Sequence, residues 1–597
     1  MKAKPVVVAA LAAAGLGTAA ATSTSIESRA VTAEVLGEIE AELGRSLASL
    51  EVPGEPKPYF IAYKVTEVEV NDVSASLGAT LAKRERHFVN LDASVRVGDY
   101  QLDNANFVIP RQEDVDGLAS ITLPLEATPR IARKAAWLAT DAAFQEALAQ
   151  YTAKQASLRR RTTAGAAVPS YTREPPVVAM DPVVVPPLES ASDLEALAAR
   201  VSLAFRDRPT IRESHVAYTS FLERRWYLNA EGTRAHDTRR VTGVVIVAST
   251  RADDGEVLSL YTSHYGHTLA DLPPVAALEK EAASLADQLD ALRAAPVLGN
   301  YTGPVLFEGV GAAGIVRHTL APQLSGTPVP DGSPDEDFLG GKLTDRIGLR
   351  VVSPLLSVID DPTTNRAAGH ALIGGYRFDD EGVPGRRVQV IDRGKLVTLL
   401  MSRTPSAKIA HSNGHARRAG TGIFTGSPTN LFLRGHRGKS ARALRRALIA
   451  EAKAQGLDYG LIVAQFDDPV VTANGELGPR QLLEELNARR GSELPRVALA
   501  YRLYTDGRIE LVRGVQLAET PLRIWRDVIA VGNRPAVLSF LATTDDGTGL
   551  RLRGGGPGFV PSAGIESSIV TPALLFRELD AKRAPASLIP PPPVPKP

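Results

Sequence analysis

The sequence has 597 residues, of which 44% are hydrophobic and 23% are charged. These proportions are typical of a globular protein with several domains, and they exclude a wholly disordered or fibrous chain. The 68 Lys and Arg residues are balanced by 67 Asp and Glu residues. The resulting net charge of +1 creates no global field for nucleic acid or an anionic membrane, so we expect no nucleic-acid partner.

The sequence contains no cysteine. This composition excludes disulfides, thiolate zinc sites, iron–sulfur clusters and cysteine nucleophiles.

The first 21 residues have the pattern of a secretory signal peptide. Lys2 and Lys4 precede an apolar run, Val6–Leu16, and a stretch of small residues follows it. We predict cleavage after Ala21 and an exported mature protein, either periplasmic or extracellular; a buried N-terminal helix is the alternative. The run is short for a membrane span and no later segment reaches about 18 uninterrupted apolar residues, so we expect no transmembrane segment in the mature chain.

The predicted N-terminal region covers residues 22–300. Apolar residues at helical spacing predict a helix over Val31–Leu50, which Pro53-Gly54 ends. The period then changes to two, which predicts an extended run from Tyr59 to Val70 and further strands over Ser74–Leu81 and His87–Val97. A second helix is predicted over Ala132–Leu158.

A proline-rich stretch at about residues 168–190 predicts a linker or an extended segment packed on a surface. Helices are predicted after it over Asp193–Phe205 and Leu278–Leu292. Strands are predicted between them over His215–Leu222, Arg225–Leu228 and Thr242–Ser249. This order repeats the helix and strands of Val31–Val97, which hints at a duplicated N-terminal half.

The predicted C-terminal domain covers residues 301–580, and a proline-rich tail at 581–597 follows it. Its expected elements are a strand at Val305–Glu308, a helix at Gly311–Leu324, a strand at Val351–Asp360, a hairpin of Val388–Ile391 and Leu396–Met401, a helix at Ala441–Gln455 and a hairpin of Val497–Tyr504 and Ile509–Val512. Asp506-Gly507 provides the second hairpin with a favoured turn pair. The chain as a whole is predicted to be of the α+β class.

Several short motifs stand in a fixed order along the chain. They are Asn229-Ala230-Glu231-Gly232, Gly303–Glu308, Gly311–His318, Arg346-Ile347-Gly348, Val358–Asp361, Phe378–Pro384, Ser427–Asn430, Asp527–Asn533 and Thr571–Leu575. Over about Leu194–Leu579 they resemble the TldD/PmbA family of zinc metallopeptidases, the U62 group. Arg96–Tyr100 and Asp103–Phe107 resemble an exported bacterial branch of that family. The resemblance implies an N-terminal helix-plus-antiparallel-sheet region and a β-rich C-terminal domain.

The resemblance also implies where zinc would bind. Active members carry H-E-x-x-x-H on the helix after the first strand of the C-terminal domain, with a later Cys as third ligand. Arg317 falls on the first His, His318 on the Glu and Pro322 on the second His, while the Cys would fall within 554–558, where none stands. We therefore predict no metal and no other cofactor. Arg317 is expected on the helix surface, with binding of a peptide carboxylate as the alternative.

Three functions follow. The first is a non-catalytic partner subunit or peptide-binding scaffold, because PmbA-like members also lack the motif and pair with a TldD-type subunit; a homodimer is the other assembly. The second is an active zinc peptidase whose ligands come from a partner chain or from a rearranged set: His318, His370, His411, His415, Glu308, Asp360 and Asp361. The third is a structural protein that binds the cell envelope. Outside the second function, His411 and His415 are predicted to be loop histidines, because the Asn-Gly turn between them keeps them off one helical face.

Overall fold

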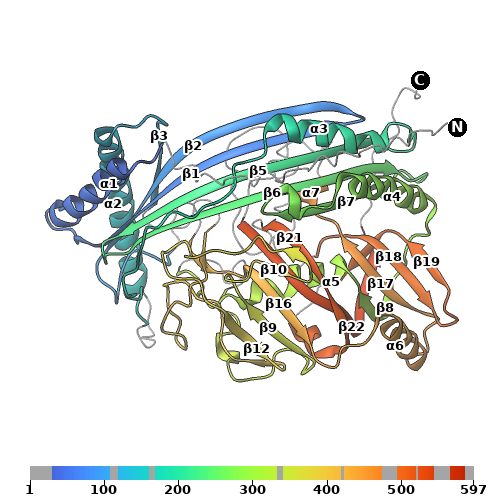
Figure 1. Ribbon diagram of the computed structural model, residues 1–597. Helices are drawn as coiled ribbons and strands as arrows, with labels where there is room; N and C mark the ends of the chain where they lie inside the picture. Colours follow the sequence, from blue (N-terminus) through green and yellow to red (C-terminus); the bar gives the residue numbers. More distant parts are fainter. Residues whose placement is uncertain are drawn as a thin grey trace, which may run out of the picture.

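The computed structural model describes residues 30–107, 118–160, 168–331, 340–418, 423–472, 494–518, 522–542 and 565–584. The predicted signal peptide, the tail from Pro585 and the stretch 554–558, where the third ligand is expected, all lie outside these described residues. The α+β prediction is confirmed: a helix-flanked antiparallel sheet lies across a β-rich C-terminal half (Figure 1).

A sheet of long strands dominates the N-terminal half. Its order is β3-β2-β1-β5-β6-β4, with β7 also paired to β6. The bounds are β1 Pro58–Ser76, β2 Ala79–Val97, β3 Leu118–Leu123, β4 Val178–Ala179, β5 Glu213–Asn229, β6 Arg234–Arg251 and β7 Val257–Gly266. The two segments with a shared order of elements therefore lie in one sheet, where β1 pairs with β5.

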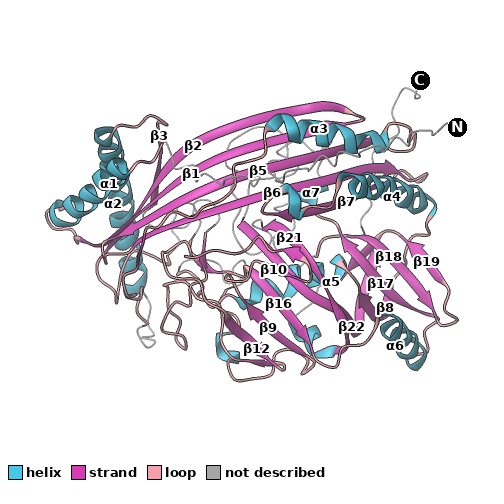
Figure 2. Cartoon of the chain, viewed as in Figure 1, coloured by secondary structure: helices cyan, strands magenta, loops and turns pink. Residues whose placement is uncertain are grey.

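Four helices cover the two ends of this sheet (Figure 2). They are α1 Ala33–Ser49, α2 Pro129–Arg159, α3 Ala191–Ser202 and α4 Val275–Ala294. Helices α1 and α2 pack on each other at one end, and α3 and α4 pack on each other at the other end. The side chains of Thr32, Thr128 and Ser190 accept hydrogen bonds from backbone N–H groups of the first turns, which fixes where three of the helices begin.

A larger mixed sheet forms the C-terminal half. Its longest strand, β22 Ile565–Arg583, pairs with β8, β16, β20 and β21. The other strands are β8 Tyr301–Phe307, β9 Leu356–Asp360, β12 Val388–Asp392, β13 Lys395–Leu396, β16 Asn430–Gly435, β17 Tyr459–Phe466, β18 Val497–Tyr504, β19 Ile509–Val512, β20 Val515–Leu517 and β21 Val528–Ala542.

Short elements complete this half. Two two-residue hairpins pair β10 Arg366–Ala367 with β11 His370–Ala371 and β14 Ala416–Arg417 with β15 Thr425–Gly426. The helices are α5 Val310–Ile315, α6 Ala441–Ala454 and α7 Pro469–Thr472. Within the described ranges, no helix combines the length and the apolar character that crossing a bilayer requires.

The structure confirms the long helices and the Asp506-Gly507 hairpin, but it corrects several strands. The predicted strand Ser74–Leu81 is wrong, because Leu77 (φ 53°) and Gly78 (φ 88°) form the turn between β1 and β2. The predicted pair His215–Leu222 and Arg225–Leu228 is the single strand β5, and β7 was not predicted at all. The strand predicted at Val351–Asp360 begins only at Leu356.

The predicted second strand Leu396–Met401 is also wrong, because the strand there is only Lys395–Leu396. The next residues instead form other backbone contacts: the Leu400 amide donates to the Leu324 carbonyl, and the Leu400 carbonyl accepts from Gly326. The predicted hairpin itself is present, because β12 pairs with β13, but an irregular segment takes the place of most of its predicted second strand.

Candidate functional site

The motif helix follows directly on β8. Gly309 (φ 56°) ends the strand and α5 begins at Val310. Two glycines let this helix lie close to β17: a Cβ on Gly311 would stand 2.5 Å from the Val463 carbonyl oxygen, and one on Gly314 would stand 2.5 Å from the Phe466 ring. These close approaches require glycine and fix the position of the residues that follow.

The predicted helix Gly311–Leu324 is present, but it changes geometry along its length. After α5 the chain forms a π-helical turn at Val316–Leu320 and then a 3₁₀ turn at Ala321–Leu324. Pro322 has no N–H to continue an α-helical ladder, which is a physical reason for the change. The motif positions therefore do not share one regular helical face.

Arg317 is buried, so the expectation of a helix-surface arginine is wrong. Its side chain is 6% exposed, and Nη1 donates to Asp468 Oδ2 at 2.9 Å. The guanidinium also lies 4.1 Å from the centre of the Phe540 ring. A fixed positive charge thus occupies the position of the first motif His.

The other two motif positions offer no ligand set. His318 is half-buried, with its ring centre 6.0 Å from that of Phe466. Pro322 is buried and has no donor atom in its side chain. Tyr261 and Tyr265 of β7 lie close by: burial raises the pKa of both hydroxyls, and the Asp468 charge raises them further. The motif thus faces the N-terminal sheet.

The alternative ligands are spread over the C-terminal half, and several of them hold other partners. His415 is fully buried, with Nε2 3.1 Å from Asp360 Oδ1. Glu308 pairs with Arg445 at 2.8 Å, and Asp361 accepts from the backbone of Thr363. His370 and His411 are exposed. Together with His318, they form no group with converging ligand atoms in the part of the chain that the structure describes.

One group of three potential ligands does occur among the described residues. Glu67, Glu69 and His87 place a ligand atom each within 4.8 Å of one another, on paired strands β1 and β2. Arg224 lies 2.7 Å from Glu69 and 3.3 Å from Glu67. Because this arginine already pairs with both carboxylates, the group resembles a structural ion cluster more than a metal centre.

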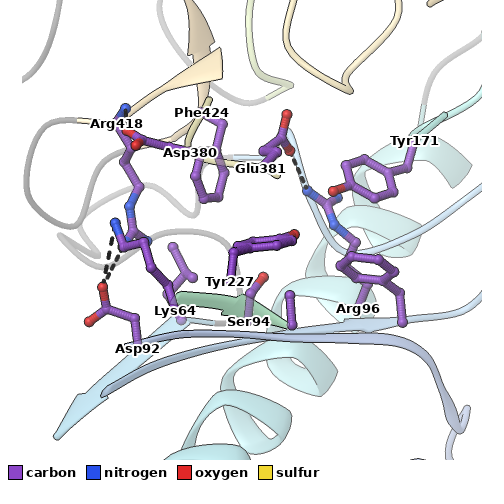
Figure 3. Close-up of a pocket in the computed structure, with 13 residues that line it drawn as sticks. Lys64, Asp92, Ser94, Arg96, Tyr171, Tyr227, Asp380, Glu381, Arg418 and Phe424 are labelled. Carbon is purple, nitrogen blue, oxygen red and sulfur yellow. Dashed lines mark hydrogen bonds and ion pairs between the residues drawn. The ribbon is translucent and has the colours of Figure 1, made fainter. Parts of the chain in front are cut away.

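A cavity that the sequence did not predict lies between the N-terminal sheet and the loop Phe378–Pro384 (Figure 3). It has about 360 Å³ of empty space, part of it open to solvent. Arg96 points toward Glu381, and Lys64 lies beside Asp92 at 3.7 Å. Burial lowers the pKa of Lys64, although Asp380 and Asp92 oppose this effect.

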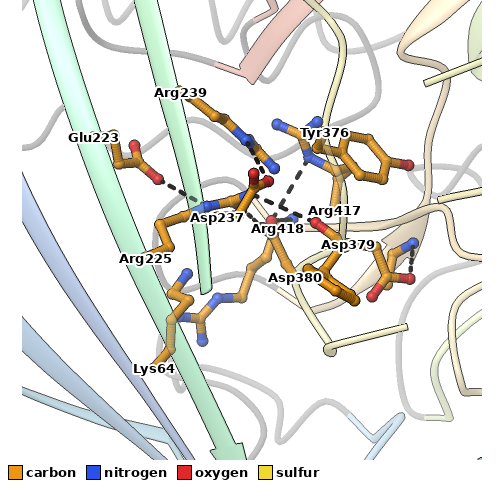
Figure 4. A network of polar contacts seen from close by, with 12 residues as sticks. Lys64, Glu223, Arg225, Asp237, Arg239, Tyr376, Asp379, Asp380, Arg417 and Arg418 are labelled. Atoms are coloured by element: carbon orange, nitrogen blue, oxygen red, sulfur yellow. Dashed lines mark hydrogen bonds and ion pairs between the residues drawn. The ribbon is translucent and has the colours of Figure 1, made fainter. Parts of the chain in front are cut away.

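A network of buried ion pairs continues from this cavity and joins the two halves (Figure 4). Arg225 of β5 donates to Asp380 at 2.8 Å, and Arg239 of β6 donates to Glu566 of β22 at 3.2 Å. Arg417 also donates to Glu566, at 3.0 Å. Burial disfavours the charge of Asp380, but Lys64, Arg417 and Arg225 outweigh this and hold its pKa well below the usual range. These ion pairs could not be predicted from the sequence, because their partners lie on segments far apart in the chain.

Comparisons with known proteins agree with this architecture. Residues 299–477 match the model of the PmbA/TldA metallopeptidase C-terminal domain. A Methanocaldococcus jannaschii protein named as a metalloprotease is 35% identical over 91 residues, which are 15% of this chain and 19% of that relative. The comparisons support the TldD/PmbA family for this chain, and the matched model itself covers the C-terminal domain.

Solved structures extend the likeness beyond the matched domain. TldE from Thermococcus kodakarensis superposes with a TM-score of 0.57 at 12% identity, covering 92% of this chain and 99% of that one. A proposed modulator of a DNA gyrase from Thermotoga maritima gives 0.54 at 15% identity, covering 91% and 99%. At such identities the likeness shows a shared fold, so this chain has a TldD/PmbA-type fold in both halves. The curated metalloprotease match spans only a fifth of its relative and transfers no activity.

The Arg317–Asp468 pair gives a first prediction. Arg317→Ala leaves the buried Asp468 carboxylate without this guanidinium, and breaking a buried pair in this way costs about 3–5 kcal/mol. We expect the double variant Arg317→Ala/Asp468→Ala to lose less than the sum of the two single losses, with a coupling of about 0.5–3 kcal/mol. Urea unfolding of the four proteins measures this coupling; strictly additive losses would show that the pair is not an energetic unit.

The inter-half network gives a second prediction. Asp380→Asn removes one of the buried anions that neutralise Arg225 and Arg417, so we expect a loss of about 3–5 kcal/mol in the free energy of unfolding. The matched control is Glu279→Gln, which breaks the exposed pair with Arg200 and should cost at most about 1 kcal/mol. Equal losses in the two variants would contradict the assigned importance of the network.

A third prediction concerns acid. The pKa of Asp380 is depressed by its cationic neighbours, and Arg239 and Arg417 likewise lower that of Glu566 against the effect of burial. The ionised carboxylates of Asp380 and Glu566 therefore contribute their full stabilisation of the folded protein above their unfolded-state pKa values of about 4. This contribution is lost as the pH falls toward their lower folded-state pKa values. We expect the free energy of unfolding to drop between about pH 4 and pH 2. The drop should be smaller in Asp380→Asn, as acid titration of both proteins can establish.

Proposed function

We propose that this chain is a non-catalytic TldD/PmbA-family protein that pairs with a metal-bearing TldD-like subunit or with a second copy of itself and helps to enclose a peptide-binding chamber. One observation carries the proposal. The first ligand position of the family's motif holds Arg317, whose guanidinium is buried against Asp468 at 2.9 Å.

The chemistry of the motif residues supports this proposal. A guanidinium stays protonated and cannot donate a lone pair to zinc, and a proline side chain has no donor atom. The sequence also has no cysteine to serve as the third ligand of the active relatives. His318 alone would supply one imidazole, whereas zinc sites use three or four protein ligands.

The fold shared with TldE supports a binding role for this chain over the loss of all function. Gly311 and Gly314 still hold the motif helix against β17, so the scaffold around the motif is intact although its ligands differ. The likeness to TldE covers 92% of this chain, which includes the long N-terminal sheet. A protein that keeps both halves of the fold without the ligand set fits a subunit that shapes a chamber for a partner's chemistry.

We also infer that the protein acts outside the cytoplasm. The charged residues Lys2 and Lys4, the apolar run Val6–Leu16 and the small residues up to Ala21 support a cleaved signal peptide. Sequencing the N-terminus of the protein purified from its own host tests this inference; a chain that retains Met1 would contradict it.

Native mass spectrometry of the protein from its own host is the decisive experiment for the proposed function. We expect a metal-free chain, bound either to a metal-bearing relative or to a second copy. One zinc per chain that survives gentle chelation would overturn the proposal and make peptidase assays the next step. Retention on purified cell envelope, without any binding of peptides, would favour the envelope-binding alternative.

A control for this experiment comes from the chain itself. Arg317→Ala removes the fixed charge but creates no ligand, so its zinc content should stay at that of the wild-type protein. A zinc content that rises in Arg317→Ala would show that ligands outside the motif are poised to bind metal and that Arg317 alone excludes it.

A further inference from the structure

A second cavity lies between the turn after β5, the turn after β2 and the segment around Arg173. It has about 830 Å³ of empty space that opens to solvent. We call it the tyrosine cavity; the residues that matter for its chemistry are Tyr59, Asp99, Tyr100, Arg173, Glu174 and Glu231. It combines aromatic rings with three carboxylates and one exposed arginine.

Two turns that the sequence motifs contain position this cavity. Asn229 Oδ1 accepts from the amides of Glu231 and Thr233, and Gly232 has a φ of 96°, so the turn after β5 holds Glu231 in place. Gly98 has a φ of 97°, and Asp99 Oδ1 accepts from the amides of the next turn at 2.8 and 2.9 Å. The motifs Asn229–Gly232 and Arg96–Tyr100, which have no role in the proposed function, therefore meet at this cavity.

The two tyrosines form a fixed aromatic wall. Their ring centres are 4.7 Å apart, edge to face. The Tyr59 hydroxyl donates to Asp103 at 2.7 Å, and the Tyr100 hydroxyl donates to Glu231 Oε1 at 2.8 Å. Because both hydroxyls are held, the rings are oriented before any ligand arrives.

Arg173 already shows what this wall attracts. Its guanidinium carbon lies 4.0 Å from the centre of the Tyr100 ring, which is a cation–π contact. Among the described residues, this exposed side chain makes no ion pair or hydrogen bond. A contact of this kind at an exposed position is weak, so Arg173 can leave the ring readily.

The carboxylates leave acceptors for a cation. Glu231 Oε1 accepts from Tyr100 and from Arg403 at 2.7 Å, whereas its Oε2 is buried and has no hydrogen-bond partner in the described part of the chain. Glu174 uses Oε1 to accept from Thr172 at 3.1 Å. Asp99, Glu174 and Glu231 thus each use one carboxylate oxygen in hydrogen bonds with described residues, which leaves the other oxygen for a further donor.

We propose that the tyrosine cavity binds an organic cation, a guanidinium or ammonium group such as a basic peptide side chain carries, and that Arg173 is its exchangeable internal occupant. A guanidinium stacks on a tyrosine face and donates to several acceptors at once, which matches a wall of rings flanked by carboxylate oxygens. Three carboxylates against Arg173 and the buried Arg403 leave the site with excess negative charge. The proposal rests on this cavity alone and not on the absence of zinc at the motif.

Isothermal titration of the full mature chain with N-acetyl-arginine amide tests the proposal, with N-acetyl-citrulline amide as the uncharged control of the same shape. We expect heat and a measurable Kd for the arginine compound only. Arg173→Ala is the sharpest variant, because Arg173 is exposed and its loss does not threaten the fold. If Arg173 occupies the cavity, removing it should tighten the Kd by about 3-fold or more.

Two substitutions of one residue separate the ring from its hydroxyl. Tyr100→Leu removes the aromatic face and should weaken binding about 10-fold. Tyr100→Phe keeps the face and should stay within about 3-fold of wild type, which also controls for folding. Equal affinity for the arginine and citrulline compounds, or a Kd that Arg173→Ala leaves unchanged or weakens, would overturn the proposal.

The source of the cation is resolved in a further arm with n-propylguanidine, which carries the guanidinium without peptide groups. Tighter binding of N-acetyl-arginine amide than of n-propylguanidine assigns the site to peptides, and equal binding assigns it to free guanidinium compounds. A failure of both guanidinium probes refutes the cavity proposal and leaves the zinc measurement, and thus the proposed function, unaffected.

Discussion

Charge pairing between the two halves, out of contact with water, is the constraint on which this fold depends. Arg225 reaches Asp380, Arg239 reaches Glu566, Arg403 reaches Glu231 and Arg418 reaches Asp92, and each pair joins the N-terminal sheet to the C-terminal half. Removing one partner of such a pair leaves a desolvated charge, which is more costly than never having buried the pair. The pairs therefore specify how the two sheets meet, and they do so on β2, β5, β6 and the turn after β5.

This constraint explains which strands the sequence could predict. The helices have apolar stripes and capping residues, so local patterns found α1, α2, α3 and α4 within a few residues of their bounds. The start of β6, in contrast, reads Arg234–Arg240, with five ionisable side chains in seven residues that look like a loop. Four of those side chains are buried, and Arg239 reaches its partner Glu566 327 positions along the chain, so no window of local sequence contains that information.

The candidate site shows the same division. Aligning the motif predicts that Arg317, His318 and Pro322 form no zinc site, and this stays a prediction. The burial of Arg317 was not predictable, because its partner Asp468 stands 151 positions along the chain. The π-helical turn was equally hidden, since Pro322 explains why an α-helix stops but does not determine which turn replaces it. The tyrosine cavity needed three separate segments to meet, and only the order of short motifs pointed to any of them.

Arginine fills a place suited to a cation in two parts of this molecule, and the surroundings determine whether it can leave. At the motif, the Arg317 side chain is buried and pairs with a buried carboxylate, so releasing it would cost about 3–5 kcal/mol. At the tyrosine cavity, Arg173 is exposed and lies on a ring, a contact worth about 0.5–1 kcal/mol. Thermal motion alone can reverse the second arrangement but not the first. The motif position is therefore permanently occupied by the chain's own charge, whereas the tyrosine cavity can exchange its occupant for a ligand.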